Sequence, residues 1–386
     1  MEVIVGGRKK ARQSYGFDEV AVVPAAVSID VADVDTSWYL GDDCFRIPIL
    51  ASAMDGVTDP RLAIEMGKLG GLAVLNLEGV QTRYEDADAA IRQIIEPPAD
   101  SVIPVIQKIY QEPIKPELIE YRIKAIKAGG QLAAVSAIPA VAKKYAEIIF
   151  NAGADIMVIQ STVTTAQFIS SRGESVSIAD FCKESPIPVI VGNSVTYEGA
   201  MSLMEAGADA VLVGVGPGAA CTTRKVCGIG VPMITTTADS AAARDDFEAR
   251  TGKYVPIISD GGMRTGGDII KAFVAGADAV MIGSPIAAAA EAPGKGYHWG
   301  MATSHPGLPR GTRVQVGVKY SLNELLFGPA NTDNGTMNLI GALKLAMSYC
   351  GARTIKELQE AEMIIAPSLP TEGKTAQRAQ NVGQWR

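Results

Sequence analysis

The stretch AGADAVLVG, residues 206–214, decides the fold of this 386-residue chain. Its glycine can adopt the left-handed conformation with which many helices end, and the apolar run that follows lacks polar alternation. Such a run is typical of a parallel strand that is buried on both faces. Closely similar phrases occur at residues 152–159, AGADIMVI, and at residues 275–283, AGADAVMIG. Three copies of one module predict a fold of repeated strand–helix units.

Eight apolar runs extend this pattern, and the segments between them are mostly helical in period. The predicted strands are 47–52, 71–76, 131–136, 155–160, 188–193, 210–215, 256–260 and 279–284. Eight such units predict an α/β fold, the (β/α)8 or TIM barrel. A ninth run, residues 102–107, has Pro104 at its centre. Proline lacks the N–H that a strand ladder needs, so we place this run outside the barrel.

We expect a single domain over residues 1–386, because no change in composition marks a second one. With 47% hydrophobic residues the chain can bury a large core. The segment from Gly294 to Gly335 is rich in Gly, Pro and Thr and has weak periodicity. A structureless loop of this length is usually a lid or a disordered segment, so we predict a flap insertion at 295–335.

Charge and cysteine content exclude several classes of protein. The net charge is −7, and the densest basic run, residues 8–10 with Arg12, is too short for a nucleic-acid footprint and indicates a solvated arm. No apolar run approaches the ~20 residues of a membrane span, and the N-terminus lacks the apolar core of a signal peptide. The five cysteines are odd in number and form no zinc spacing. We expect a reduced, cytoplasmic protein that binds neither nucleic acid nor membrane.

Small and polar residues follow the predicted strands, and in a barrel the carboxyl ends of the strands build the active site. The sixth strand leads into GVGPGAACTTR, residues 214–224. Its glycines allow a sharp turn with exposed amides and carbonyls, and the nearby guanidinium favours a thiolate at Cys221. Cys221 is therefore a candidate nucleophile. Its loop position alone leaves open the alternative of a small, buried, apolar side chain.

Two glycine-bearing turns follow the seventh and eighth strands, at residues 259–262 and 282–284. In a barrel this position commonly holds a phosphate, although two tight turns without a ligand would have the same sequence. Asp260 could accept hydrogen bonds from vicinal ribose hydroxyls. His298 and His305 have no carboxylate at a metal-ligand spacing, so we expect no metal role for them. No Walker A loop and no helix-opening GxGxxG occurs, so a nicotinamide cofactor would not sit in a Rossmann half.

The loop that contains Cys221 resembles that of a known enzyme family. GPGAACTTR, residues 216–224, resembles the catalytic cysteine loop shared by inosine monophosphate (IMP) dehydrogenases and GMP reductases. The resemblance runs from about Tyr15 to Ala366. The supporting motifs are SAMD at 52–55, GN at 192–193, DGG at 260–262, MIGS at 281–284, EAPG at 291–294, and Tyr297 near the GM of 300–301.

The resemblance implies a reaction and a set of site residues. Cys221 attacks C2 of the purine, hydride passes from C2 to NAD, and water positioned or deprotonated by Thr223 hydrolyses the thioimidate to xanthosine monophosphate. The implied substrate-binding residues are Asp260 for the ribose, Gly262, Gly283, Ser284 and Tyr297 for the phosphate, and Met54, Gly300 and Met301 for the base. The implied cofactor-binding residues are Gln160, Ser161, Asn193 and Gly214. The carbonyls of Gly216, Gly218 and Cys221 are implied to bind a monovalent cation such as potassium.

The chain departs from the family pattern at several positions. Only residues 81–130 separate the second and third strands, too few for the regulatory CBS repeats of most dehydrogenases, so we expect no CBS domain. Ala219 replaces a phosphate-binding serine, and residues 160–162, Gln-Ser-Thr, replace Asp-Ser-Ser at the cofactor ribose. No Arg-Tyr pair lies between Met301 and Arg313. Arg310, before Gly311, is either a catalytic guanidinium acting on water or the purine, or a surface residue.

Three functions remain open, with IMP dehydrogenase as the leading hypothesis. The amino-acid sequence of strands six to eight, including EAPG at 291–294, is more similar to that of dehydrogenases. The missing Arg-Tyr pair and CBS repeats favour GMP reductase, which uses the same cysteine but takes hydride from NADPH and releases ammonia. The third hypothesis is a non-catalytic purine-nucleotide-binding paralogue, against which the retained Cys221 argues. The resemblance also implies a homotetramer or homo-octamer.

Overall fold

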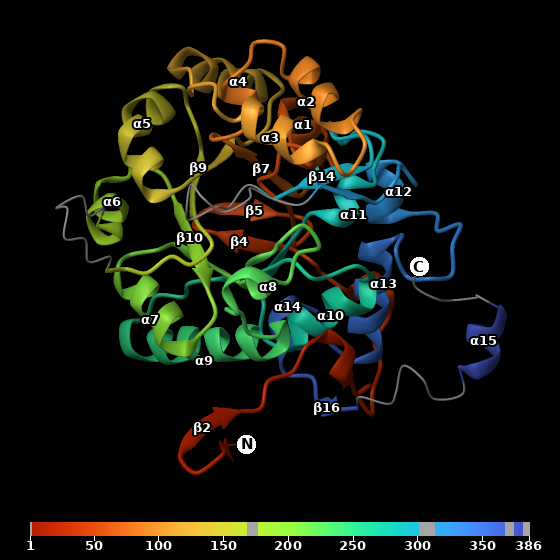
Figure 1. Ribbon diagram of the computed structural model, residues 1–386. Coiled ribbons are helices and arrows are strands. Elements are labelled where there is room, and N and C mark those ends of the chain that lie inside the picture. Colours follow the sequence, from red (N-terminus) through yellow and green to blue (C-terminus); the bar gives the residue numbers. More distant parts are fainter. Residues whose placement is uncertain (1, 168–176, 301–312, 367–373, 381–386) are drawn as a thin grey trace.

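The computed structural model describes residues 2–167, 177–300, 313–366 and 374–380. Its centre is a closed barrel of eight parallel strands, which follow one another around the barrel in chain order (Figure 1). The barrel strands are β6 (Ile49–Ala51), β7 (Leu72–Asn76), β8 (Ala134–Ala137), β9 (Ile156–Gln160), β10 (Val189–Ser194), β11 (Ala210–Val213), β12 (Ile257–Asp260) and β13 (Ala279–Ile282). All eight predicted strands and the TIM-barrel class are confirmed.

Most helices pack around the barrel, α15 lies apart from it in Figure 1, and short antiparallel strand pairs lie outside the barrel. The helices are α1 (Pro60–Lys68), α2 (Ala87–Ile95), α3 (Val102–Ile109), α4 (Pro116–Ala128), α5 (Pro139–Asn151), α6 (Ile178–Glu184), α7 (Tyr197–Glu205), α8 (Thr223–Cys227), α9 (Met233–Thr251), α10 (Gly266–Val274), α11 (Ser284–Ala287), α12 (Leu322–Phe327), α13 (Leu339–Tyr349), α14 (Ile355–Gln359) and α15 (Thr375–Gln380). The strand pairs are β1 (Glu2–Val5) with β2 (Lys9–Arg12), β3 (Val20–Val22) with β16 (Met363–Ile365), β4 (Trp38–Leu40) with β5 (Asp43–Phe45), and β14 (Tyr297–Trp299) with β15 (Arg313–Gln315).

The repeated AGAD phrase has a structural reason. Its second residue is a glycine with φ between +85° and +106° in all three copies, as a left-handed helix end requires. Its aspartate then accepts a hydrogen bond from the backbone N–H at or next to the start of the preceding barrel strand. These bonds join Asp155 to Ala133 at 2.7 Å, Asp209 to Val189 at 2.9 Å and Asp278 to Ile257 at 2.7 Å. Each copy therefore ends a helix and fastens two neighbouring strands.

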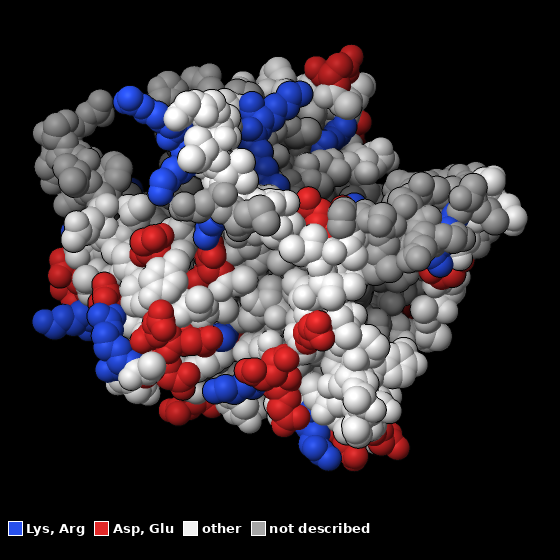
Figure 2. Space-filling model, turned by 90° about the horizontal axis from the view of Figure 1, so that it is seen from below, with Lys and Arg blue, Asp and Glu red and all other residues white. Residues whose placement is uncertain are grey.

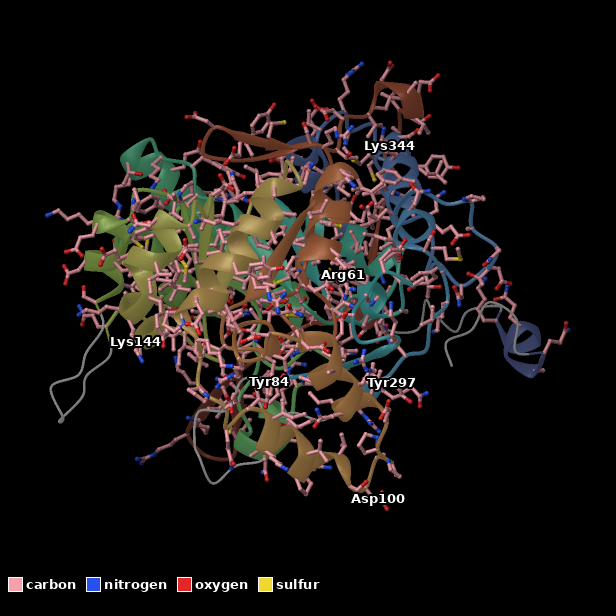
Figure 3. The ribbon with its side chains drawn as sticks, turned by 90° about the horizontal axis from the view of Figure 1, so that it is seen from above. Arg61, Tyr84, Asp100, Lys144, Tyr297 and Lys344 are labelled. Carbon is pink, nitrogen blue, oxygen red and sulfur yellow. The ribbon has the colours of Figure 1, made fainter. Side chains whose placement is uncertain are left out.

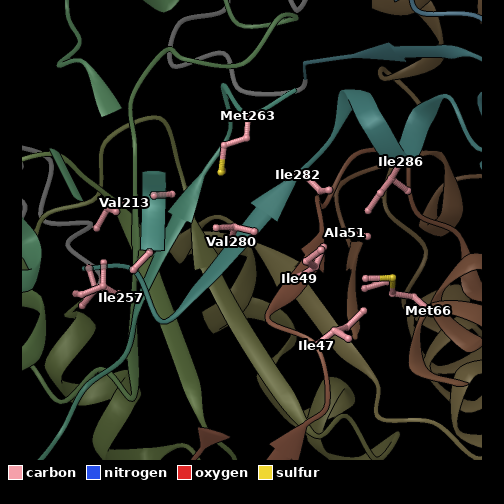
Figure 4. Packing of buried hydrophobic residues seen from close by; sticks show 14 of the residues in the cluster. Ile47, Ile49, Ala51, Met66, Val213, Ile257, Met263, Val280, Ile282 and Ile286 are labelled. Carbon is pink, nitrogen blue, oxygen red and sulfur yellow. The ribbon is translucent and has the colours of Figure 1, made fainter. Parts of the chain in front are cut away.

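The apolar runs supply two layers of core because side chains alternate across each strand. Leu50, Leu212 and Met281 point into the barrel with residues of the other strands. Ile49, Val213 and Val280 point outward and pack against the helices, as Figure 4 shows. Burial on both faces explains why these strands carry no polar alternation.

The amino end of the barrel is closed by a hairpin that the strand prediction omitted. Trp38, Leu40 and Phe45 of the β4–β5 pair belong to the same buried cluster as the inward side chains of the barrel. The rings of Trp38 and Phe45 stack with centroids 5.0 Å apart. Side chains of the hairpin therefore fill this end of the barrel.

One sequence-based expectation is confirmed and can be made more specific, and another needs revision. Residues 102–107 lie outside the barrel as predicted, but they form the start of helix α3, whose first turn tolerates Pro104 because the leading N–H groups of a helix lack partners anyway. The segment 294–335 was expected to lack secondary structure. Its described residues form β14, β15 and α12, with the capping box of Ser321 and Glu324 starting the helix.

Charged side chains of both signs lie on the surface of the molecule. The face in Figure 2 carries several basic side chains in its upper part and a mixture of acidic and basic side chains in its lower part, and uncharged atoms interrupt the upper basic area. Among the described residues, no helix has the length and apolar content needed to cross a bilayer.

Candidate active site at the carboxyl ends of the strands

Cys221 lies on the loop between β11 and α8, at the rim where the barrel strands end. Its side chain is exposed, which excludes the alternative of a buried apolar residue. The thiol donates to the Thr223 hydroxyl over 3.2 Å, and the Cys221 N–H donates to the Gly218 carbonyl over 2.9 Å. The loop therefore presents the sulfur to solvent with a hydroxyl beside it.

Arg224 fixes the shape of this loop from within. Its guanidinium donates to the Val215 carbonyl over 3.2 Å and to the Val231 carbonyl over 2.7 Å, which ties the beginning of the loop to its end. Burial lowers the pKa of Arg224, and the nearby Cys221 thiol acts in the opposite direction. Gly216 and Gly230 leave the room that the Arg224 stem occupies, and both have positive φ angles that favour glycine.

A carboxylate held by two amides lies at the centre of the rim. Asp260, at the end of β12, accepts the Asn193 amide at 2.9 Å and the Gln160 amide at 3.1 Å, both on Oδ2. Burial raises the pKa of Asp260 to about 6, and the Asn193 hydrogen bond lowers it in part. No described residue donates to Oδ1, so this oxygen is available to a ligand hydroxyl. Three predicted residues from three strands are thus brought together.

The two glycine turns face the cysteine loop and the end of β6. Gly262, with φ +81°, packs against Pro217 of the cysteine loop, and Gly283 lies against Met54 and Ser52. Backbone this close to neighbouring side chains excludes a Cβ at Gly262 unless Pro217 shifts. The Ser284 hydroxyl follows Gly283 and lies 3.0 Å from Nε2 of His298.

Strand β14 separates its side chains between two environments. Tyr297 and Trp299 pack against a cluster formed by helices α2 and α3, and the guanidinium of Arg313 lies 4.9 Å from the Tyr297 ring centroid. Figure 3 shows Tyr297 on this helical side of the molecule. His298 points the opposite way, to Ser284, because side chains alternate along a strand. The implied contact between Tyr297 and a phosphate stays a prediction.

The other predicted site residues fall into two groups. Gly214 adjoins the Asp260 carbonyl, and the Ser161 hydroxyl lies 2.8 Å from Thr164 Oγ1 and donates to the Val163 carbonyl. Gly300 follows β14. Met301 and Arg310 lie outside the described residues, so their roles stay predictions.

The donor set near Cys221 fits a monovalent cation better than a transition metal. Gly216 and Gly218 are half-buried in the loop, and the Gly218 carbonyl, which accepts one N–H, keeps a second lone pair. In the described part of the chain no group of three His, Cys, Asp or Glu side chains could hold a metal ion. Neutral carbonyl oxygens are ligands for hard cations, so the predicted potassium site is chemically reasonable.

Sequence reasoning missed two groups of residues near the site. His298 was considered only as a metal ligand, and the spacing criterion said nothing about its hydrogen bond to Ser284. Asp55 was part of a motif without a role. It is fully buried, and it accepts hydrogen bonds from the Tyr110 hydroxyl and from the Val80 N–H at 3.1 Å. The alternation of side chains along β14 would have placed His298 on the opposite face from Tyr297. The sequence analysis did not predict this strand.

Comparisons with known proteins agree with this geometry. Residues 14–303 match the profile described as the IMP dehydrogenase / GMP reductase domain. An uncharacterised oxidoreductase of Mycobacterium tuberculosis is 38% identical over 372 residues, covering 94% of this chain and 99% of its own. The inosine-5'-monophosphate dehydrogenase of Methanocaldococcus jannaschii is 28% identical, with 93% and 94% covered. That alignment, over 472 residues, is longer than this chain, so the archaeal protein contains residues that this chain lacks.

A solved structure supports the same relationship. The crystal structure of an IMP dehydrogenase/GMP reductase-like protein from Corynebacterium glutamicum superposes with a TM-score of 0.89 at 36% identity, covering 94% of this chain and 97% of that one. The similarity therefore includes the barrel and nearly everything around it. With its barrel, its cysteine loop and a profile match over most of its length, this chain belongs to the IMP dehydrogenase / GMP reductase family.

Proposed function

We propose that the protein is an IMP dehydrogenase, which oxidises IMP to xanthosine monophosphate with NAD in guanine nucleotide synthesis. The observation that carries this proposal is the exposed Cys221 thiol, 3.2 Å from Thr223 on a loop that packs against the glycine turn of Asp260. A thiol in this position can act as a nucleophile toward a ligand whose sugar and phosphate are held by the neighbouring strand ends.

The residues divide the work as follows. Asp260 accepts hydrogen bonds from the ribose hydroxyls, and Met54 lies against the base. The turns with Gly262, Gly283 and Ser284 hold the phosphate. Cys221 forms a bond to C2 of the purine, and a hydride leaves that carbon. Bound NAD supplies the acceptor for the hydride, and Gln160, Ser161, Asn193 and Gly214 would hold it. Thr223 orients or deprotonates the water that releases the product and restores the thiol.

Potassium, or a similar cation, would lie on the carbonyls of Gly216, Gly218 and Cys221. Bound there, it would help to fix the conformation of the cysteine loop. We further propose that the protein is a cytoplasmic homotetramer or homo-octamer, as the family resemblance implies. We also propose that it has no CBS domain, since helices α2 and α3 and the surrounding loops account for residues 81–115 between β7 and α4.

GMP reductase is the second candidate. The absence of an Arg-Tyr pair between Met301 and Arg313 favours it, because a reductase has no need to activate water. The Gln160 amide in place of a carboxylate also changes the cofactor side of the rim. The third candidate, a non-catalytic nucleotide-binding protein, would not need the exposed Cys221 thiol.

One assay separates the three. The protein is mixed with IMP, NAD and potassium, and NADH absorbance is followed; the measurement is then repeated with GMP and NADPH. A rise in the first mixture identifies the dehydrogenase, and a fall in the second identifies the reductase. No change in either, with nucleotide binding retained in calorimetry, identifies the binding protein and overturns the proposal.

Replacement of the nucleophile tests the covalent mechanism itself. Cys221→Ala should abolish turnover, with a loss of at least about 10³-fold, while IMP still binds, because the ribose and phosphate contacts come from other strands. Cys227→Ala is the matched control, since Cys227 is also exposed and lies on the same loop–helix segment. Retained activity in Cys221→Ala would exclude a covalent intermediate on this residue.

A further inference from the structure

His298 is not among the residues that the family resemblance identified, but it contacts one of them, Ser284. His298 is 2% exposed, and its Nε2 lies 3.0 Å from the Ser284 hydroxyl oxygen. Its other ring nitrogen, Nδ1, is buried and has no hydrogen-bond partner among the described residues. A buried histidine with one partnered and one unpartnered nitrogen has a preferred proton position.

The ring is neutral at ordinary pH and carries its proton on Nε2. Burial lowers the pKa of His298 to about 4, so the neutral form prevails. A neutral imidazole has one N–H and one lone pair. Buried N–H groups without an acceptor are rarer in proteins than buried acceptors without a donor. The hydrogen-bond network therefore assigns the proton to Nε2, where it has an acceptor, and the lone pair to the unpartnered Nδ1.

This assignment fixes what the serine hydroxyl can do. If Nε2–H donates to Ser284 Oγ, the single hydroxyl proton of Ser284 is not needed for that contact and can be donated elsewhere. An anionic oxygen is the partner that benefits from such a donor. Ser284 is half-buried and follows Gly283, which packs against Ser52 and Met54 at the end of β6, so the hydroxyl lies at the rim.

The position of His298 is tightly constrained. A Cβ on Gly56 would lie 2.9 Å from the His298 Cα and 2.5 Å from the Tyr297 carbonyl oxygen, so β14 passes directly over the loop after β6. Gly294 donates its N–H to the Gly56 carbonyl over 3.1 Å. Trp299, on the other side of the strand, donates to the Tyr110 hydroxyl over 2.8 Å. These contacts hold the imidazole in place before any ligand arrives.

We propose that His298, rather than Tyr297, is the residue of β14 that serves the anion subsite: it positions Ser284 as a hydrogen-bond donor to the phosphate monoester of the substrate. The inference rests on the proposed function, since it assumes a nucleotide at this rim. His298 is a positioning residue that acts through Ser284. Tyr297 instead stabilises the packing of β14 on helices α2 and α3.

Paired variants test the role of Nε2. In glutamine the side-chain nitrogen is as many bonds from Cα as Nε2 is in histidine, whereas the asparagine nitrogen corresponds to Nδ1. His298→Asn should raise the dissociation constant of IMP about 10-fold and leave that of inosine, which lacks the phosphate, within about 2-fold. His298→Gln should restore most of the IMP affinity. Ser284→Ala should have little further effect in the His298→Asn background, because without the Nε2–H donor the Ser284 hydroxyl is no longer held toward the phosphate.

Three outcomes would overturn the inference. Equal weakening of IMP and inosine by His298→Asn would indicate a structural role only. Unchanged IMP affinity in His298→Asn would show that His298 has no role in phosphate binding. A large loss in Tyr297→Phe with none in His298→Asn would return the phosphate contact to Tyr297. Trp299→Phe is the control for general loosening of β14, because it removes the bond to Tyr110 without touching Ser284.

A ligand-free measurement distinguishes failure of this inference from failure of the proposed function. The chain contains only two histidines, so solid-state ¹⁵N spectra of histidine-labelled protein, with His305→Gln for assignment, report the tautomer of His298 directly. We expect the proton on Nε2. A proton on Nδ1 would overturn the inference even if the enzyme oxidises IMP. The Nε2 tautomer together with no binding of IMP, GMP or inorganic phosphate would overturn both the subsite and the proposed function.

Discussion

Asp55 is the individual residue whose environment is most unusual for its type. It is completely buried, and its Oδ2 accepts hydrogen bonds from the Tyr110 hydroxyl and the Val80 N–H. Its Oδ1 is buried without a partner among the described residues. Burial raises the pKa of Asp55 to about 6, although the two hydrogen bonds act in the opposite direction. The native state therefore holds a proton on Asp55 more tightly than the unfolded chain does.

This shift predicts a pH dependence of stability. Because the native pKa exceeds the unfolded one, the contribution of Asp55 is fully present below about pH 4 and is lost as the pH rises through about 6. Its size is on the order of 2–3 kcal/mol. Between pH 7 and 5, Asp55 and Asp260 should both add to the free energy of unfolding in urea, whereas His298, whose pKa burial lowers to about 4, should reduce it. The contribution of Asp55 is therefore measured as the difference between the wild type and Asp55→Asn, which should grow by about 1 kcal/mol in favour of the wild type from pH 7 to pH 5. A difference that does not change with pH would refute the shift.

At the same scale, the sequence was sufficient to select Cys221 as a candidate nucleophile but not to predict the contacts around the site. Cys221 could be predicted because glycines, a strand end and a neighbouring guanidinium all lie within a few residues of it. The His298–Ser284 and Asp55–Tyr110 contacts join residues 14 and 55 positions apart. Such contacts depend on how β14 and α3 pack on the barrel, and local pattern says nothing about that packing.

At the scale of elements, the three AGAD modules make the same backbone contact in different surroundings. Asp209 pairs with Lys253 at 3.0 Å near the surface. Asp278 is 12% exposed in its side chain and accepts from Arg244 at 2.9 Å and from Tyr254 at 2.5 Å. Arg244 is itself 4% exposed. The repeated phrase was sufficient to predict the strands, since each copy carries its own helix end and strand start.

The different surroundings of Asp209 and Asp278 predict that an aspartate-to-asparagine substitution lowers the free energy of unfolding by different amounts at the two positions. Asp209→Asn should lower the free energy of unfolding by about 1 kcal/mol or less, because an exposed ion pair is worth little. Asp278→Asn should lower it by about 3 kcal/mol, because the buried guanidinium of Arg244 loses its buried partner. Urea unfolding of the two variants at pH 7 provides the comparison. Equal costs would mean that the shared backbone hydrogen bond, and not the buried charge, determines the stability of the module.

Element boundaries were harder to predict than element types. Residues 102–107 have the apolar content of a strand, and the proline that excluded them from the sheet is also compatible with the first turn of a helix. The β14–β15 pair was missed because its strands are three residues each and are separated along the chain. Arg313 of β15 donates to the carbonyls of Ile94 and Ile95 at the end of α2, a tertiary contact that helps to define this pair.

At the scale of the whole molecule, the filled end of the barrel and the candidate site lie at opposite ends of the strands. The β4–β5 hairpin fills the amino end, and Cys221, Asp260 and Ser284 lie where the strands finish. This division is general among TIM barrels, in which loops at the carboxyl ends vary in function while the other end supports the fold. It allows a substitution at the filled end to change stability without changing the site.

Trp38 tests this separation. Its side chain is 4% exposed and stacks on Phe45, and its indole N–H is buried without a partner among the described residues. Trp38→Ala should lower the free energy of unfolding by about 3–5 kcal/mol, because it leaves a cavity beneath the barrel. Trp38→Phe keeps most of the volume and removes the unpartnered N–H, so it should cost less than about 1.5 kcal/mol. At a temperature where both variants are folded, the rate at which a thiol reagent modifies Cys221, followed by peptide mass spectrometry, should match that of the wild type. A changed modification rate at Cys221 in Trp38→Ala would show that the β4–β5 hairpin and the cysteine loop are coupled through the barrel. The two ends of the barrel would then not be independent.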